Sequence, residues 1–294
     1  MVKEITVKSV LNKHRKRDEW FLDDYSVNPY EQCAFNCIYC YIRGSKHGEN
    51  LEKNLAVKVN APRILERELH RRARRAEIGF IAFSSSTEAW QPIEQKYKLT
   101  KRLLEIVRHY KFPVHVLTKS KLILRDLDLL KRIDEEAILP KDLKGKLNHK
   151  TLITFSISSL NDEISRIFEP GAPTPKERLE TLQKCVEEEF FAGIAYIPLL
   201  PYISDSKEQM EEMVLTAKEY GAKYIFVGAL TLFGAGRRLY LKTLQKHFPE
   251  LIPKYEKLFK GHAPPQSYQH RLEKTAKELC KRHGIKYRIL ESTR

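Results

Sequence analysis

The sequence predicts an α/β fold in which six parallel strands alternate with helices and either curve into a partial barrel or stay as an open sheet. Over residues 23–230, short runs of β-branched and aromatic apolar residues alternate with segments of helical period. No stretch rich in Pro, Gly or Ser interrupts this order. Because repeated strand–helix–strand units produce parallel sheets, we expect one continuous domain over these residues.

The order of the elements follows from the same pattern. Strands are expected at about 24–28, 78–84, 113–119, 151–158, 193–200 and 223–230. The connecting helices are centred on 62–75, 98–110, 124–136, 175–190 and 206–221. Pro62 begins the first helix and Gly221 follows the last, where each residue type is favoured. Outside this region we expect a basic arm at 1–22, helices at about 234–260 and 264–283, and a strand at 285–290 within a C-terminal segment, 231–294.

The composition indicates a globular chain without membrane contact. Of the 294 residues, 42% are apolar, which is ample for a packed core. No apolar run approaches the roughly 18 residues of a membrane span. The first ten residues, MVKEITVKSV, lack the apolar centre of a signal peptide. A cytoplasmic location is therefore expected.

The charge suggests a polyanionic partner such as nucleic acid. The chain has 53 Lys and Arg against 38 Asp and Glu, a formal net charge of +15. A thermophile's surface is also rich in charge, so the positions of the cations must decide. The cluster at 13–17 lies in the expected arm. The arginines of 71–75 are expected to complement a helix dipole far from the site, whereas the glycines and arginines of 234–238 follow the last strand and suit a phosphate.

Three of the five cysteines, Cys33, Cys37 and Cys40, stand close together with the spacing C-x-x-x-C-x-x-C. In a reducing compartment such a cluster favours metal binding over disulfides. A closed zinc site needs four ligands, and His47 is a candidate for the fourth. A four-iron cluster held by three thiolates would instead leave one iron open to bind a substrate. The remaining cysteines fall in step with apolar residues and are expected to pack in the core: Cys185 and Cys280.

Several segments together resemble the spore photoproduct lyase-like branch of the radical S-adenosylmethionine (SAM) superfamily. They are NPYEQCAFNCIYCYIR, QPIE, LTKSKLILRDLDLL, SISSLNDEISRIFEPGAPTPKERLETL and IPLLP, and they span roughly residues 25–230. The resemblance implies a partial (β/α)6 barrel of the radical SAM type. It also implies a [4Fe-4S] cluster on Cys33, Cys37 and Cys40, and cleavage of SAM to methionine and a 5′-deoxyadenosyl radical that abstracts a substrate hydrogen.

The resemblance also implies the residues that hold SAM. Thr87 and Glu88 match the contacts to the amino group, with Glu where the lyase has Asp. Lys119 matches the lysine that binds the carboxylate. Ser156 and Ser158 follow the fourth strand, and Ser156 matches a serine of the cofactor site. In a barrel, all of these positions lie at the carboxyl ends of strands, where chemistry collects.

Two further positions bear on the reaction. Tyr39 and Tyr41 flank Cys40 and match a tyrosine pair that relays a radical in the lyase; stacking on adenine and loop packing are the alternatives. Ser85 stands where the lyase has the cysteine that donates a hydrogen atom to the repaired thymine. An O–H bond is too strong for that role, so standard reversal of spore photoproduct is not expected.

We therefore expect a radical SAM enzyme that repairs or modifies nucleic acid, with an electron donor such as ferredoxin or flavodoxin. The alternatives are radical modification of a protein or peptide and, from another class, a nucleic-acid-binding protein with structural zinc. Contacts to substrate phosphates are expected from four basic residues near the strand ends: Arg43, Lys46, Arg237 and Arg238.

Overall fold

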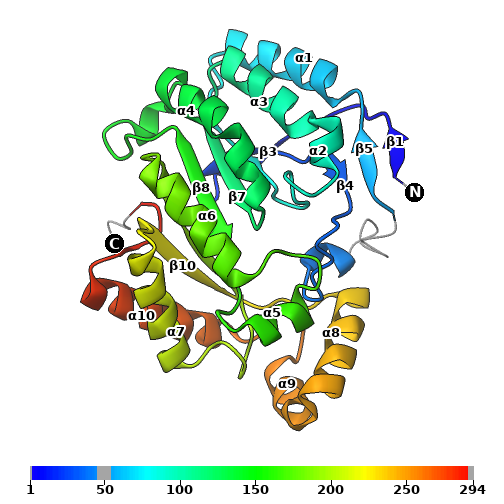
Figure 1. Cartoon of the computed structure of the whole chain (residues 1–294), viewed down its shortest axis with the longest axis vertical. Helices are drawn as coiled ribbons and strands as arrows, with labels where there is room; N and C mark the ends of the chain where they lie inside the picture. The colour runs from blue at the N-terminus through cyan, green and yellow to red at the C-terminus, as the bar shows by residue number, and fades with distance from the viewer. Residues whose placement is uncertain (1, 45–53, 291–294) are drawn as a thin grey trace. The chain divides into compact units, whose positions relative to one another are not determined.

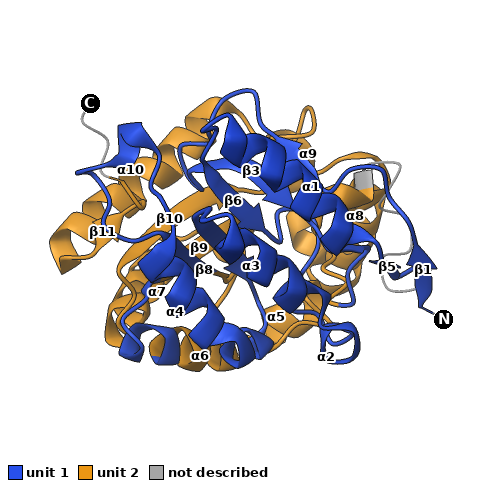
Figure 2. Cartoon of the chain, turned by 90° about the horizontal axis from the view of Figure 1, so that it is seen from above, with its two compact units in different colours: residues 1–34, 52–154, 184–192 blue, residues 35–51, 155–183, 193–294 orange. Residues whose placement is uncertain are grey.

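The computed structural model describes residues 2–44 and 54–290, and its chain forms two compact units. Unit 1 comprises residues 1–34, 52–154 and 184–192; unit 2 comprises 35–51, 155–183 and 193–294 (Figures 1 and 2). The predicted positions Lys46 and His47 lie outside the described residues. None of the helices in the described ranges combines the length and the apolar character that crossing a membrane requires.

Unit 1 contains a parallel sheet edged by one antiparallel strand. Strand β3 (Asp23–Val27) pairs in parallel with β6 (Phe80–Phe83), and β6 pairs in parallel with β7 (Val114–Thr118). Strand β2 (Leu11–Lys13) runs antiparallel to β3, with Leu11 opposite Val27. All four residues of β6 are buried, as expected for the centre of a parallel sheet.

The helices of unit 1 bury apolar stripes. Helix α1 (Ala61–Arg74) buries Ile64, Leu65 and Leu69 at helical spacing, and it packs beside α3 (Leu99–His109) (Figure 1). Helix α3 in turn packs beside α4 (Leu127–Glu136). The shorter helices of the unit are α2 (Glu94–Tyr97), η2 (Lys121–Asp126) and η3 (Lys141–Leu143).

The N-terminal residues are part of unit 1, and this corrects the expectation of a basic arm. Strand β1 (Lys3–Ile5) pairs with β5 (Ala56–Lys58), which also pairs with β4 (Tyr30–Glu31). Basic side chains of this region are used within the unit as well: Arg17 forms ion pairs with Asp24 and Asp142. The segment expected as an arm therefore contributes a strand to a sheet and ion pairs to unit 1.

Unit 2 continues the alternation. Strand β9 (Phe191–Leu199) pairs in parallel with β10 (Tyr224–Ala229), and β10 with β11 (Lys286–Tyr287). The boundary between the units falls within β8 (Thr151–Ser156), within α6 (Pro175–Glu187) and near the start of β9. The other helices of unit 2 are η1 (Tyr41–Gly44), α5 (Asp162–Phe168), α7 (Lys207–Glu219), α8 (Gly234–His247), η4 (Pro249–Leu251), α9 (Ile252–Leu258) and α10 (Gln266–His283).

These elements confirm the predicted α/β fold with a parallel sheet, since each expected strand and crossover helix is present. One helix was predicted wrongly: the segment 234–260 is broken at Phe248 and Pro249 into α8, η4 and α9. Phe248 has φ −145° and ψ 56°, because a residue that precedes proline is disfavoured in helical geometry. The predicted domain boundaries after residues 22 and 230 stay a prediction.

Candidate cofactor site

The cysteine loop has a backbone shaped by two residues of left-handed conformation. Gln32 (φ 64°) precedes Cys33, and Asn36 (φ 51°) precedes Cys37. Non-glycine residues rarely adopt positive φ, and they do so mainly where the surrounding structure fixes them. The loop is fixed in this way, because the Gln91 side chain accepts from Ala34 N at 2.9 Å.

Within unit 2, the second half of the loop is tied to the segment that follows α5. Ile38 N donates to Phe168 O at 2.8 Å, and Gly171 N donates to Phe35 O at 3.1 Å. Cys40 N donates to Cys37 O at 3.2 Å, which closes a turn between the last two cysteines. The backbone around these cysteines is thus defined by hydrogen bonds to residues distant in sequence.

Arg43 holds this loop from within, and this corrects its prediction as a substrate contact. It is 7% exposed, and its Nε donates to Cys37 O at 2.9 Å while Nη2 donates to the backbone and side-chain oxygens of Asn36. A guanidinium whose donors bind the loop backbone is not presented to a phosphate in solvent. Its task is to fix the main chain of the cysteine loop.

The chemistry of the thiols separates the three clustered cysteines from the other two. Cys33, Cys37 and Cys40 are partly exposed, whereas Cys185 and Cys280 are buried, and burial raises the pKa of each to about 12. A buried thiol of high pKa is an inert core residue, while an accessible one can be deprotonated by a metal. The donor set therefore suits a three-thiolate cluster. In the described part of the chain, no three His, Cys, Asp or Glu side chains already surround one point as ligands would.

In unit 1, the turn after β6 is built on Asn28. Its Oδ1 accepts from Ser86 N at 2.9 Å and from Thr87 N at 3.2 Å, and its Nδ2 donates to Ser85 Oγ at 3.0 Å. Thr87 is buried, and its hydroxyl donates to Tyr30 O at 3.3 Å. Asn28 thus joins the end of β3 to the serine-rich turn that carries Ser85 and Thr87.

Glu88 lies against the end of β7. Its Oε1 accepts from Thr118 Oγ1 at 2.8 Å and from Trp90 N at 3.0 Å, and its Oε2 accepts from Lys119 N at 2.9 Å. Burial raises the pKa of Glu88, and the three hydrogen bonds act in the opposite direction. Glu88 therefore fixes the relative positions of the two strand ends in addition to any contact with a ligand.

In unit 2, Tyr39 belongs to a buried polar network. Its ring packs in an apolar cluster with Phe168 and Tyr240, and its hydroxyl donates to Glu169 Oε1. Burial, reinforced by the charge of Glu169, raises the pKa of Tyr39 well above its usual value. Tyr39 is therefore neutral, and it anchors the residue before Cys40 to the core.

The centre of this network is the ion pair of Glu169 with Arg178, two residues that are 2% and 1% exposed. Arg178 Nη1 donates to Ser156 O at 3.0 Å, and Nε donates to Pro173 O at 2.8 Å. Ser158 Oγ donates to Glu169 Oε1 at 2.9 Å. The network therefore joins Tyr39 to the end of β8, where Ser156 and Ser158 were predicted to lie.

The remaining predicted residues are placed differently. Tyr41 is 53% exposed at the start of η1. Arg237 donates to the carbonyls of Phe259 (2.9 Å) and Gly261, so this guanidinium binds the end of α9 and the segment after it. Arg238 is exposed on α8.

Gly236, one of the two glycines in 234–238, has a packing reason. A Cβ on Gly236 would lie 3.1 Å from Arg43 Cβ and 3.7 Å from Cys40 O. Helix α8 thus approaches the cysteine loop closely at a residue without a side chain. This packing accounts for the glycine that was interpreted as part of a phosphate loop.

Sequence reasoning missed Asn28, Glu169 and Arg178. All three stand in the quoted segments NPYEQC and EPGAPTPKER, but no spacing rule links them to their partners. The Tyr39–Glu169 contact spans 130 positions. The available signal was the presence of two opposite charges, Glu169 and Arg178, in a region where other residues have apolar spacing.

Comparison with known proteins decides the family. The model of the Radical SAM superfamily matches residues 27–217, a range that includes the three clustered cysteines and the residues predicted to bind SAM. The chain belongs to the radical SAM superfamily. It is therefore an enzyme, and membership implies a [4Fe-4S] cluster and SAM as cofactors.

The chain is also similar to a curated protein in sequence and to solved structures in fold. An uncharacterized protein of Mycobacterium tuberculosis is 26% identical over 272 residues, covering 90% of this chain and 75% of that protein. A spore photoproduct lyase mutant with bound AdoMet and dinucleoside spore photoproduct has a TM-score of 0.67 and 17% identity, covering 95% of this chain and 81% of the other. Streptococcus suis SuiB bound to precursor peptide SuiA has a TM-score of 0.55 and 14% identity, covering 89% and 47%. At these identities, the two structures show a shared radical SAM fold.

Proposed function

We propose that the enzyme cleaves SAM reductively at a [4Fe-4S] cluster and uses the resulting radical to repair or modify nucleic acid. The observation that carries this proposal is the loop of three partly exposed cysteines, held by Arg43 and by the segment after α5. When bound and reduced, the cluster supplies one electron that breaks a carbon–sulfur bond of SAM, leaving methionine and a 5′-deoxyadenosyl radical.

We assign the cluster to Cys33, Cys37 and Cys40. Two of these thiols lie on a turn whose carbonyl, Cys37 O, accepts from both Cys40 N and Arg43 Nε. The hydrogen bonds limit backbone motion, so the thiols have only their side-chain torsions to adjust on binding. Three thiolates leave one iron of a four-iron cube without a protein ligand, and this iron is where SAM would bind.

We assign SAM contacts to residues of the strand ends. Lys119 would meet the carboxylate, because an ammonium group forms a charge-assisted hydrogen bond with it. Glu88 has about four lone-pair positions and uses three, so one stays for the SAM ammonium. Thr87 and Ser156 would contribute hydroxyl oxygens. Ser158 would act through Glu169, since its hydroxyl donates to that carboxylate.

Tyr39 and Tyr41 keep distinct proposed roles. The hydroxyl of Tyr39 already donates to the Glu169 carboxylate, which would accept its proton if the ring were oxidised. Tyr41 is exposed and would face a bound substrate or partner. An external reductant, such as a ferredoxin or a flavodoxin, would supply the electron for each reduction of the cluster.

Nucleic acid is the substrate class that the charge supports best. A net charge of +15 favours a polyanion, and the fold matches the lyase bound to a dinucleoside lesion better than the peptide-binding enzyme, with TM-scores of 0.67 and 0.55. Ser85 makes ordinary reversal of spore photoproduct an unsuitable reaction, since its hydroxyl is a poor hydrogen-atom donor. A peptide substrate is the second candidate.

The test is reductive cleavage of SAM by the anaerobically reconstituted enzyme, measured as 5′-deoxyadenosine and methionine. Replacing any one of Cys33, Cys37 or Cys40 by Ala should abolish both iron binding and cleavage, because two thiolates do not hold the cube. Cys185→Ala and Cys280→Ala are matched controls that should retain the iron content. Full cleavage by a variant of the triplet would refute the assignment.

A further inference from the structure

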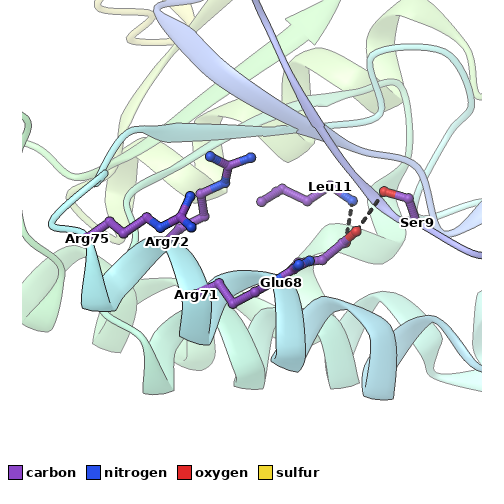
Figure 3. A pocket seen from close by; sticks show the side chains of 6 residues that line it. All are labelled: Ser9, Leu11, Glu68, Arg71, Arg72 and Arg75. Atoms are coloured by element: carbon purple, nitrogen blue, oxygen red, sulfur yellow. Dashed lines mark hydrogen bonds between the residues drawn. The ribbon is translucent and has the colours of Figure 1, made fainter.

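A small cavity in unit 1 is lined by three arginines of one helix end. Its lining residues are Ser9, Leu11, Glu68, Arg71, Arg72 and Arg75, and its volume is about 190 Å³ (Figure 3). This is below the roughly 300 Å³ at which pockets for whole organic ligands begin. The cavity therefore suits one compact group.

The helix dipole does not account for these cations. Helix α1 has Arg71, Arg72 and Arg74 in its last turn, and Arg75 follows as its cap. The negative end of a helix is equivalent to about half an elementary charge. Four arginines exceed that value several-fold, so most of their charge needs another explanation.

Among the residues that the structure describes, protein partners account for one of the three arginines of the cavity. Arg72 forms an ion pair with Glu77 and lies over the ring of Tyr25, with its Cζ atom 5.9 Å from the ring centroid. Arg71 and Arg75 are exposed, and within the described residues neither guanidinium group has a hydrogen bond or an ion pair. They are four positions apart on one helix, an arrangement in which like charges repel.

Glu68 supplies a carboxylate to the lining of the cavity, but its oxygens accept hydrogen bonds from the segment 9–11. Glu68 Oε1 accepts from Ser9 Oγ at 2.6 Å, and Oε2 accepts from Val10 N at 3.1 Å and Leu11 N at 2.9 Å. Figure 3 shows its carboxylate directed toward Ser9 and Leu11. Glu68 thus joins α1 to β2, and Arg71 and Arg75 are left to attract an anion.

We infer that Arg71 and Arg75 bind a backbone phosphate of nucleic acid at this cavity. Guanidinium groups suit phosphate because two parallel N–H donors match two of its oxygens. The inference rests on the proposed nucleic-acid substrate, and it locates a contact that Arg43 and Arg237 do not supply. Free phosphate or pyrophosphate has the same chemistry, so the experiment must separate the two sources.

The experiment measures the affinity of the full-length enzyme for a fluorescent DNA duplex at several salt concentrations. Arg71→Gln with Arg75→Gln should weaken binding about tenfold, the size of a lost charge-assisted contact, and should lower the slope of log affinity against log salt by about 1 to 2. The matched control is Arg63→Gln with Arg67→Gln, which removes two exposed arginines at the same spacing from the same helix, outside the cavity. It should change affinity less than about threefold.

Three outcomes overturn the inference. Equal losses of duplex affinity in the two double variants would mean a general effect of net charge. Absence of salt-dependent duplex binding would show that nucleic acid is not the ligand of the cavity. Pyrophosphate binding that is lost only in the cavity variant, with duplex affinity unchanged, would assign the cavity to a free anion. SAM cleavage by both variants should equal that of the unmodified enzyme, so failure here is distinguishable from failure of the proposed chemistry.

Discussion

Single side chains of the site have roles that residue type alone does not reveal. Arg43 and Arg237 were predicted to contact phosphates, yet their donors bind main-chain carbonyls of the cysteine loop and of the segment after α9. These hydrogen bonds give both side chains a role in holding the fold. Lys119 differs, because its backbone N–H holds Glu88 while its ammonium is the group proposed for SAM.

Lys119→Ala should weaken SAM binding about tenfold or more, since it removes a charge-assisted contact. The iron content should be unchanged, because the backbone N–H that binds Glu88 remains. The measurement is SAM affinity of the reconstituted enzyme, with Lys144→Ala, an exposed lysine of the same unit, as the control. Equal SAM affinity in the Lys119 variant and the control would remove Lys119 from the cofactor site.

Glu88→Gln is a poorer test of SAM binding than the sequence suggests. A glutamine amide would replace one of the two oxygens that accept from Trp90 N, Thr118 Oγ1 and Lys119 N. At least one buried donor would lose its acceptor, at a cost of about 1 to 3 kcal/mol. Loss of SAM affinity in this variant would therefore mix a lost contact with a disturbed strand end.

At the scale of elements, the Glu169–Arg178 pair joins the cysteine loop, the end of β8 and α6. Glu169 accepts from Tyr39 and Ser158, while Arg178 donates to Ser156 O. Burial of an ion pair is tolerated only when hydrogen bonds satisfy both partners, as they do here. The pair thus fixes the elements on which the cofactor residues of unit 2 lie.

Removing one partner of this pair should be more costly than removing both. Arg178→Met leaves the Glu169 carboxylate buried without its cation and should lower the free energy of unfolding by about 3 to 5 kcal/mol. The double variant with Glu169→Gln should recover part of that loss. Urea unfolding of both single variants and the double variant measures the coupling. Strictly additive losses would show that the two side chains act independently.

Strand β7 carries a buried histidine, His115, that should make the stability of the fold depend on pH. His115 contacts Phe21 O and Thr154 Oγ1, each at 2.6 Å, and burial lowers its pKa from 6.5 to about 4. Between these values, the unfolded chain binds more protons at this residue than the folded one. The contribution of His115 to stability is therefore present above pH 6.5 and is lost as the pH falls toward 4.

This loss should amount to roughly 3 kcal/mol in unfolding free energy over that range. Asp23 acts in the opposite direction, because burial raises its pKa to about 6 and the folded state then holds the additional proton. The test is therefore the difference between the pH curves of His115→Gln and the unmodified enzyme. A constant difference from pH 6.5 to 4 would contradict the assignment of the pKa shift to His115.

For the whole molecule, the regular core was predictable and the connections between distant segments were not. Apolar periodicity identified the strands that alternate with crossover helices, β3, β6, β7, β8, β9 and β10, because burial imposes the pattern locally. Strand β1 has only three residues, and its existence depends on pairing Lys3 with Ala56, which no local pattern reveals. The same holds for the buried contact of Tyr39 with Glu169.

The candidate site was predictable where a motif carries the chemistry. The cysteine spacing lies within the range that the radical SAM family model matches, and recognising it needs no tertiary information. Assigning roles to the basic residues does need tertiary information, since Arg43 and Arg71 are the same residue type and differ in their surroundings. The cytoplasmic location, the nucleic-acid substrate and the electron donor stay predictions.

The central claim is that three cysteines of this chain hold an iron–sulfur cluster, and metal analysis of anaerobically purified enzyme tests it most directly. We expect a brown protein with broad absorption at the blue end of the visible range and about four irons and four sulfides per chain. Cys37→Ala should lose them, and Cys185→Ala should not. A colourless protein that contains one zinc per chain would contradict the account and favour a structural metal site.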